Sequence, residues 1–94
     1  MNVRVVRFTG VTQEKMDTLK ARIESSGGPP EGVRTTGLTV AFDAAQGTAI
    51  VVQGFANAAD MEDSAKVFEA MDPSDTPGTR VSVDSCEVVL DVTP

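Results

Sequence analysis

Four polar residues are candidates for ligand binding because they fall in or beside valine-rich, β-prone segments: Arg7, Asp43, Gln53 and Asp84. A guanidinium group binds a carboxylate through two parallel hydrogen bonds, and a glutamine amide both donates and accepts. Arg7 and Gln53 would therefore suit an anionic or carbonyl-bearing ligand. The alternative is that Arg7 forms an inter-subunit salt bridge, for instance with Asp43, or that these side chains lie on a solvated rim.

Asp43 and Asp84 would serve as a carboxylate pair for acid–base chemistry if burial raised the pKa of one of them. For Asp43 there is a competing interpretation, because aspartate is common beside turns, where it bonds to the backbone. Cys86 is the only cysteine. A reactive thiol needs a lowered pKa, whereas the neighbouring Glu87 would raise it, so a small core residue is the simpler expectation.

Two other segments resemble binding motifs only superficially. The stretch from Asp72 to Gly78 has two carboxylates and a glycine, but its prolines and the missing glutamate at the twelfth position do not fit a calcium loop. The run from Gly27 to Pro30 matches no phosphate-binding motif. The chain has no histidine, which excludes Ser-His-Asp and Cys-His catalysis and histidine metal ligands. We expect no metal, no cofactor and no catalytic residue.

The 94-residue chain is acidic, with 8 Lys and Arg against 14 Asp and Glu and a net charge of −6. Binding to nucleic acid or to an anionic membrane surface needs clustered cations, and here the cations are scattered. No apolar run is long enough for a signal peptide or a transmembrane helix. A lone cysteine is consistent with a reducing compartment. These features predict a cytoplasmic protein that binds neither nucleic acid nor membranes.

Apolar residues recur with a period of two in some segments, as in strands, and at spacings of three and four in others, as in helices. The order of these segments predicts β-α-β-β-α-β within one domain, residues 1–94. Strands are expected over residues 3–8, 36–43, 48–55 and 80–92, and the middle two form a hairpin. This order is typical of the ferredoxin-like α+β fold, a four-stranded antiparallel sheet with both helices on one face.

Two helices are expected, one over residues 13–26 and one that follows Asn57 and ends before Asp72. Thr12 and Asn57 are the expected N-caps, and Val11 and Met16 suit a hydrophobic staple at the first helix start. Each helix carries one apolar stripe that should pack on the sheet: Met16, Leu19 and Ile23 on the first, and Met61, Ala65, Phe68 and Met71 on the second.

The two faces of the predicted sheet differ in side-chain size. Alternation assigns the bulkier set to the helix-covered face: Val6, Phe8, Leu38, Val40, Phe42, Ile50, Val52, Val81 and Val83. The open face receives a smaller, mixed set: Val3, Val5, Arg7, Thr39, Ala41, Asp43, Ala49, Val51, Gln53 and Phe55. A face with this much apolar surface is usually covered, and a second subunit is the natural candidate.

In the last predicted strand the apolar positions change phase near Asp84 and Ser85. The apolar residues have odd numbers before this point, Val81 and Val83, and even numbers after it: Cys86, Val88, Leu90 and Val92. The change predicts a bulge or a bend, through which the strand would continue onto a partner's sheet. A long terminal strand with a frayed end is the alternative.

Segments in order along nearly the whole chain also suggest a family. They are Val3–Gly10, the hairpin Leu38–Ile50, the helix entry Phe55–Met61 and the closing Cys86–Val89. In pattern and order the chain resembles the dimeric α/β-barrel superfamily, in particular its antibiotic-biosynthesis-monooxygenase-like branch.

The resemblance implies a homodimer whose two sheets enclose a small cavity, and Arg7 and Gln53 fall on the face that would line it. In enzymatic members that cavity oxidises polycyclic aromatic substrates or degrades haem with the help of Trp, His, Tyr or Asn side chains. This chain has no Trp, His or Tyr, and its asparagines are Asn2 and Asn57. We therefore expect a non-catalytic homodimer that holds a small ligand between its sheets. The alternatives are a cofactor-independent monooxygenase or isomerase that uses Arg7, Gln53 or Asp84, and a ligand-sensing regulatory module.

Overall fold

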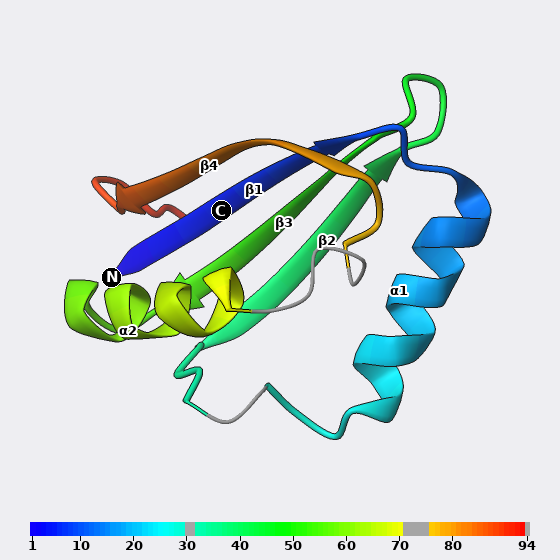
Figure 1. Ribbon diagram of the computed structural model, residues 1–94. Coiled ribbons are helices and arrows are strands. Elements are labelled where there is room, and N and C mark those ends of the chain that lie inside the picture. Colours follow the sequence, from blue (N-terminus) through cyan, green and yellow to red (C-terminus); the bar gives the residue numbers. More distant parts are fainter. Residues whose placement is uncertain (30–31, 71–75, 94) are drawn as a thin grey trace.

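Figure 1 shows a computed structural model of the chain, which describes residues 1–29, 32–70 and 76–93. The elements are β1 (Asn2–Thr9), α1 (Gln13–Ser25), β2 (Gly37–Asp43), β3 (Thr48–Phe55), α2 (Ala58–Glu69) and β4 (Thr79–Glu87). The strands form one antiparallel sheet in the order β2-β3-β1-β4. The predicted ferredoxin-like α+β fold is confirmed. Met71 and most of the loop from Asp72 to Gly78 lie outside the described residues.

Both helices begin at the residues that the sequence predicts. The hydroxyl oxygen of Thr12 accepts a hydrogen bond from the Lys15 amide at 3.2 Å, and the Asn57 side chain accepts one from the Asp60 amide at 2.8 Å. These bonds satisfy N–H groups that the first helical turn leaves without partners. Val11 is 4% exposed and Met16 packs on the same core cluster, as a staple requires.

The core lies between the sheet and the first turn of α1. Val6 and Phe8 of β1 pack with Val11 and with Ala49 of β3, all of them buried. A second buried group, Phe55 with Met61 of α2, lies at the opposite end of β3. Between the two groups, Arg4, Val51 and Gln53 line cavities on this face of the sheet.

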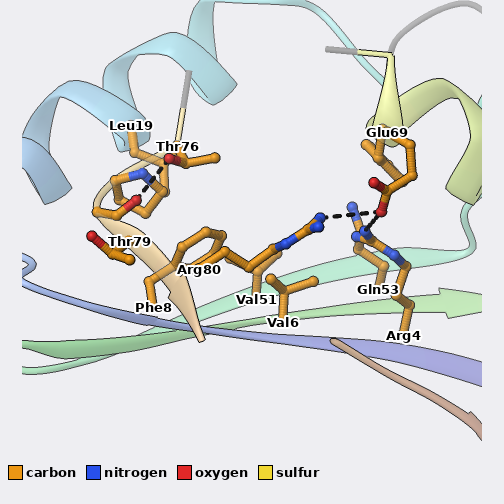
Figure 2. A pocket seen from close by; sticks show the side chains of 13 residues that line it. Arg4, Val6, Phe8, Leu19, Val51, Gln53, Glu69, Thr76, Thr79 and Arg80 are labelled. Carbon is orange, nitrogen blue, oxygen red and sulfur yellow. Dashed lines mark hydrogen bonds and ion pairs between the residues drawn. The ribbon is translucent and has the colours of Figure 1, made fainter. Parts of the chain in front are cut away.

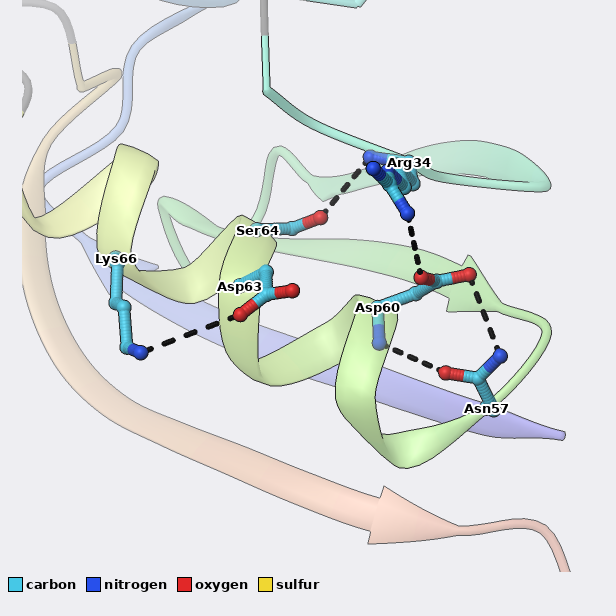
Figure 3. A network of polar contacts seen from close by, with 6 residues as sticks. All are labelled: Arg34, Asn57, Asp60, Asp63, Ser64 and Lys66. Atoms are coloured by element: carbon cyan, nitrogen blue, oxygen red, sulfur yellow. Dashed lines mark hydrogen bonds and ion pairs between the residues drawn. The ribbon is translucent and has the colours of Figure 1, made fainter.

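The loop before β2 is fastened to α2 by polar contacts (Figure 3). The backbone N–H of Arg34 donates to Ser64 Oγ at 3.0 Å, and Ser64 is fully buried. The Arg34 guanidinium also contacts the Asp60 carboxylate at 3.7 Å. Asp60 in turn receives a bond from the Asn57 amide group at 3.4 Å. These contacts fix the entry to β2 against the helix.

Helix α1 differs from its prediction because it buries none of its residues. Only Met16 reaches the core cluster, while Leu19 stays half-buried and Ile23 is 37% exposed. The stripe offers one large apolar side chain per turn, which is too little to close the helix onto the sheet along its length. A space therefore remains between α1 and the sheet.

The predicted faces of β3 were wrong. Residues directly opposite each other on paired strands share a face. Gln53 lies opposite Arg4 and Leu38, and Val51 lies opposite Val6 and Val40. The helix-covered face thus receives Ala49, Val51, Gln53 and Phe55, and the open face receives Ile50 and Val52. Alternation within β3 was ambiguous because both phases of this strand are largely apolar.

Strand β4 also departs from its prediction. The register shift lies opposite Arg7 and Phe8, where Ser82 and Arg80 are the partners and Val81 is the extra residue. The bulge is therefore earlier than the predicted position near Asp84. The strand ends at Glu87 rather than at Val92.

Within residues 88–93, one further backbone hydrogen bond connects the chain after β4 to the start of the chain. The Val88 N–H donates to the Met1 carbonyl at 3.0 Å. Beyond it three large apolar side chains are exposed: Val89 (91%), Leu90 (78%) and Val92 (71%).

Candidate functional site

A cavity of about 490 Å³ opens on the helix-covered side of the sheet (Figure 2). Its apolar walls are formed by Val6 and Phe8 of β1, Val51 of β3, Leu19 of α1 and Phe68 of α2. It exists because α1 does not close onto the sheet. Sites for small molecules typically have volumes of about 300–1,000 Å³ and mainly apolar linings, so both size and character fit.

A second cavity, of about 680 Å³, adjoins the first. The two share Leu19, Val51, Gln53 and Phe68. The second cavity then follows α1 along the sheet toward the β2 side chains of Leu38 and Val40, among others. An elongated apolar ligand would thus find continuous contact from β1 to β2.

Arg4 is the unusual residue of the first cavity. It belongs to β1, one of the two inner strands of the sheet, and lies two residues before Val6. Arg4 is only 5% exposed. Its guanidinium donates a hydrogen bond to Gln53 Oε1 at 3.2 Å and lies 5.0 Å from the centroid of the Phe68 ring. A cation over an aromatic face is attracted by the ring quadrupole. The sheet and α2 together hold this charge inside the wall of the cavity.

Two more charged side chains lie at the same place. Glu69, the last residue of α2, has one carboxylate oxygen 3.7 Å from Arg4 Nη2 and 3.1 Å from Arg80 Nη1. Glu69 and Arg80 are half-exposed, with side-chain exposures of 56% and 44%. Burial lowers the pKa of Arg4, while the Glu69 charge opposes that shift and Arg80 adds to it.

Gln53 faces this cavity and not the open face. It is 8% exposed, and its carbonyl oxygen accepts the bond from Arg4. Within the described part of the chain its amide nitrogen makes no hydrogen bond, and that nitrogen is not sealed from solvent. Gln53 can therefore present N–H donors to a bound molecule.

The other three predicted site residues lie on the open face, away from Gln53. Arg7 is exposed and lies opposite Ile50 and Ser82. Asp43 and Asp84 belong to β2 and β4, the two edge strands, so β3 and β1 separate them. The structure therefore does not bring them together as a carboxylate pair within one chain.

Asp43 has a local role at the β2–β3 hairpin. Its carboxylate accepts bonds from the Gln46 side chain at 2.7 Å and from the Gln46 amide at 3.2 Å. These bonds lower the pKa of Asp43, because they stabilise the charged form. This matches the turn interpretation and is opposite to what a general acid at neutral pH needs.

Cys86 is a free thiol, half-buried on the open face opposite Val3. It does not lie in the core between sheet and helices. Within residues 1–29, 32–70 and 76–93, no three His, Cys, Asp or Glu side chains cluster so that they could hold a metal ion. The calcium-like segment lies largely outside these ranges.

Arg4, Glu69 and Arg80 are not among the site residues that the sequence predicts. Arg4 did carry a signal, because it has the same alternation phase as Val6 and Phe8 and so had to share their buried face. Glu69 and Arg80 carried none. They meet Arg4 only because α2 ends, and β4 begins, beside β1.

No protein-family model, curated protein or solved structure matches this chain. The resemblance to the dimeric α/β-barrel superfamily therefore stays a hypothesis. Within the described residues, no helix has both the length and the apolar character needed to cross a membrane.

Proposed function

We propose that the protein binds a small organic molecule in the cavity between the helices and the sheet. This keeps the predicted ligand-binding role and moves it from the space between two sheets to the helix side, where Gln53 lies. The observation that carries the proposal is the pair of buried polar side chains, Arg4 and Gln53, in an otherwise apolar wall. A mainly apolar pocket with a few convergent polar groups is the usual form of a ligand site.

The proposal includes a homodimer formed through the open face. Support comes from the half-buried Val3, Val5, Ile50 and Val52, which lie together on that face with Cys86. Apolar surface gathered on one face of a small domain is typically covered by a partner. Arg7, which forms no ion pair within the described residues, would meet Asp43 or Asp84 of a second copy.

A cytoplasmic location and an oxygenase or ligand-sensing role are secondary parts of the proposal. The free cysteine agrees with a reducing compartment. An oxygenase and a sensor would each have to bind a ligand first. A binding experiment is therefore the first test of either role.

Ligand binding is tested by titrating the protein with a panel of small aromatic and aliphatic compounds while methyl NMR signals are recorded. The compounds that bind should shift the Leu19 and Val51 methyl signals, which line both cavities, and leave Ile50 and Val52 on the open face unchanged. Replacement of Leu19 by tryptophan should fill the space and abolish the shifts of the Val51 methyl signals.

The matched control is Ala21→Trp, which adds the same ring on an exposed position of the same helix. It should leave binding unchanged. Shifts confined to the open face, or binding that survives Leu19→Trp intact, would contradict the proposed location.

A further inference from the structure

The guanidinium of Arg4 has more donors than the protein uses. A guanidinium carries five N–H donors. Within the described residues, the Arg4 side chain makes one hydrogen bond, to Gln53, and its contact with Glu69 is 3.7 Å. Charge-assisted hydrogen bonds between nitrogen and oxygen are about 2.7–2.9 Å, so the Glu69 carboxylate is paired with Arg4 in charge but not closely bonded to it. N–H groups of a buried cation thus remain for another acceptor.

Glu69 already places a carboxylate between two guanidinium groups. One of its oxygens contacts both Arg4 and Arg80, as Figure 2 shows. The side chain reaches inward from the end of α2 and is 56% exposed, so it can turn into solvent without losing a buried position. The protein's own side chain therefore occupies the position that an incoming carboxylate would take.

The charges around this position favour a monoanion. Among the described residues that line the first cavity, only Arg4, Arg80 and Glu69 are charged, two positively and one negatively. A ligand carboxylate that takes the place of Glu69 leaves the charge between Arg4 and Arg80 unchanged, whereas a phosphate dianion would bring additional negative charge close to the displaced Glu69. The apolar walls formed by Val51 and Phe68 suit the remainder of such a molecule.

We propose that the ligand is a monocarboxylate with an apolar body, and that its carboxylate replaces Glu69 between Arg4 and Arg80. This inference rests on the proposed function, because it assigns a ligand class to the same cavity. The head group bonds to Arg4 and to the amide nitrogen of Gln53. The apolar body runs along α1 toward Leu38.

The test compares octanoate with octan-1-ol, which has the same chain without the charge. Titration calorimetry should give octanoate an affinity about tenfold higher or more than octanol, the ratio expected for a buried charge-assisted bond. Arg4→Met keeps an apolar side chain in the wall and should reduce octanoate binding to the level of octanol. Arg7→Met, on the same strand but the open face, is the matched control and should change neither affinity.

Glu69→Gln tests the displacement itself. The variant should bind octanoate about two- to fivefold more tightly than the unchanged protein, because a half-exposed ion pair no longer competes. Octanol binding should not respond. If Arg4→Met does not fold, Arg80→Met should still lower octanoate affinity and leave octanol affinity unchanged.

The outcomes separate this inference from the proposed function. If neither octanoate nor octanol binds, and the compound panel also fails, the cavity is not a ligand site. If both bind equally and Arg4→Met affects neither, the cavity binds ligands but the carboxylate class is wrong. A loss of octanoate affinity in Glu69→Gln, or in Arg7→Met as large as in Arg4→Met, also overturns the inference.

Discussion

Arg4 is difficult to explain as a contribution to stability. Moving a charge from water into a protein interior costs several kcal/mol, and replacing buried ion pairs by apolar residues is often neutral or stabilising. Arg4 recovers part of that cost from Gln53, Phe68 and Glu69, at contacts that are long or exposed to solvent. A role in holding a ligand accounts for its position better than a role in holding the fold.

Ser64 has the opposite character, since its hydrogen bond with the backbone of Arg34 is structural. It is fully buried and its oxygen accepts the Arg34 backbone N–H at 3.0 Å. In Ser64→Ala that N–H loses its acceptor, and we expect the free energy of unfolding to fall by about 1–3 kcal/mol. Urea denaturation followed by circular dichroism measures the change.

Ser25→Ala is the control for Ser64→Ala. The Ser25 hydroxyl bonds to the Arg22 carbonyl on an exposed turn, where water can replace it. Its effect should stay within about 0.5 kcal/mol. Equal effects of the two substitutions would mean that the contact between α2 and the loop before β2 adds no stability.

At the scale of elements, the order and types of helices and strands followed from the sequence because each has a clear period and a clear start. Thr12 and Asn57 marked the helix starts, and the alternation of Leu38, Val40 and Phe42 marked β2. The faces of β3 did not follow, since valine and isoleucine occupy one phase while alanine, valine and phenylalanine occupy the other. The pairing with β1 and β2, where Gln53 lies opposite Arg4 and Leu38, decides between them.

Less of the candidate site than of the fold could be predicted from the sequence, because the site also depends on contacts between elements. Gln53 was found, but on the wrong face, and Asp43, Arg7 and Asp84 belong to the open face. The charged group brings Arg4 of β1 together with Glu69 of α2 and Arg80 of β4, which lie far along the sequence from Arg4. Whether these side chains meet depends on how far α1 and α2 cover the sheet. The apolar periodicity of the sequence cannot predict this, because it indicates only which side of each element is apolar.

The β2–β3 hairpin should respond to acid through Asp43. Its hydrogen bonds with Gln46 lower the pKa of Asp43 below the usual 3.8. The unfolded chain therefore binds the proton first, so the stabilising effect is fully present above pH 3.8 and is lost as pH falls through the lower folded value. A carboxyl-carbon NMR titration should give a midpoint below 3.8.

Gln46→Ala is the comparison for this titration. It removes the side-chain donor at 2.7 Å but keeps the backbone donor at 3.2 Å. The midpoint of Asp43 should move up toward 3.8 without passing it. An unchanged midpoint would show that the Gln46 side chain does not bond to Asp43 in solution.

At the scale of the whole molecule, the open face predicts self-association. Sedimentation equilibrium should give twice the chain mass of 9.8 kDa at micromolar concentration. Val5→Lys places a charge in the middle of this face, opposite Val52 and Asp84, and should yield the monomer. The reason is that a desolvated ammonium group would lie in the interface.

Ala21→Lys adds the same charge on an exposed position of α1 and should leave the dimer intact. A single-chain mass for the unchanged protein would end the dimer proposal. It would leave ligand binding standing, because the cavity is built from one chain alone.

The sparse contact between α1 and the sheet affects how fast the proposed ligand can enter the cavity. The helix buries none of its residues, and Met16 in its first turn is its contact with the core cluster. The far end can therefore swing away while every strand pairing stays intact, with the first turn as hinge. Entry would then be gated by this motion, and the association rate would reach a plateau as ligand concentration rises, instead of increasing without limit as simple diffusion requires.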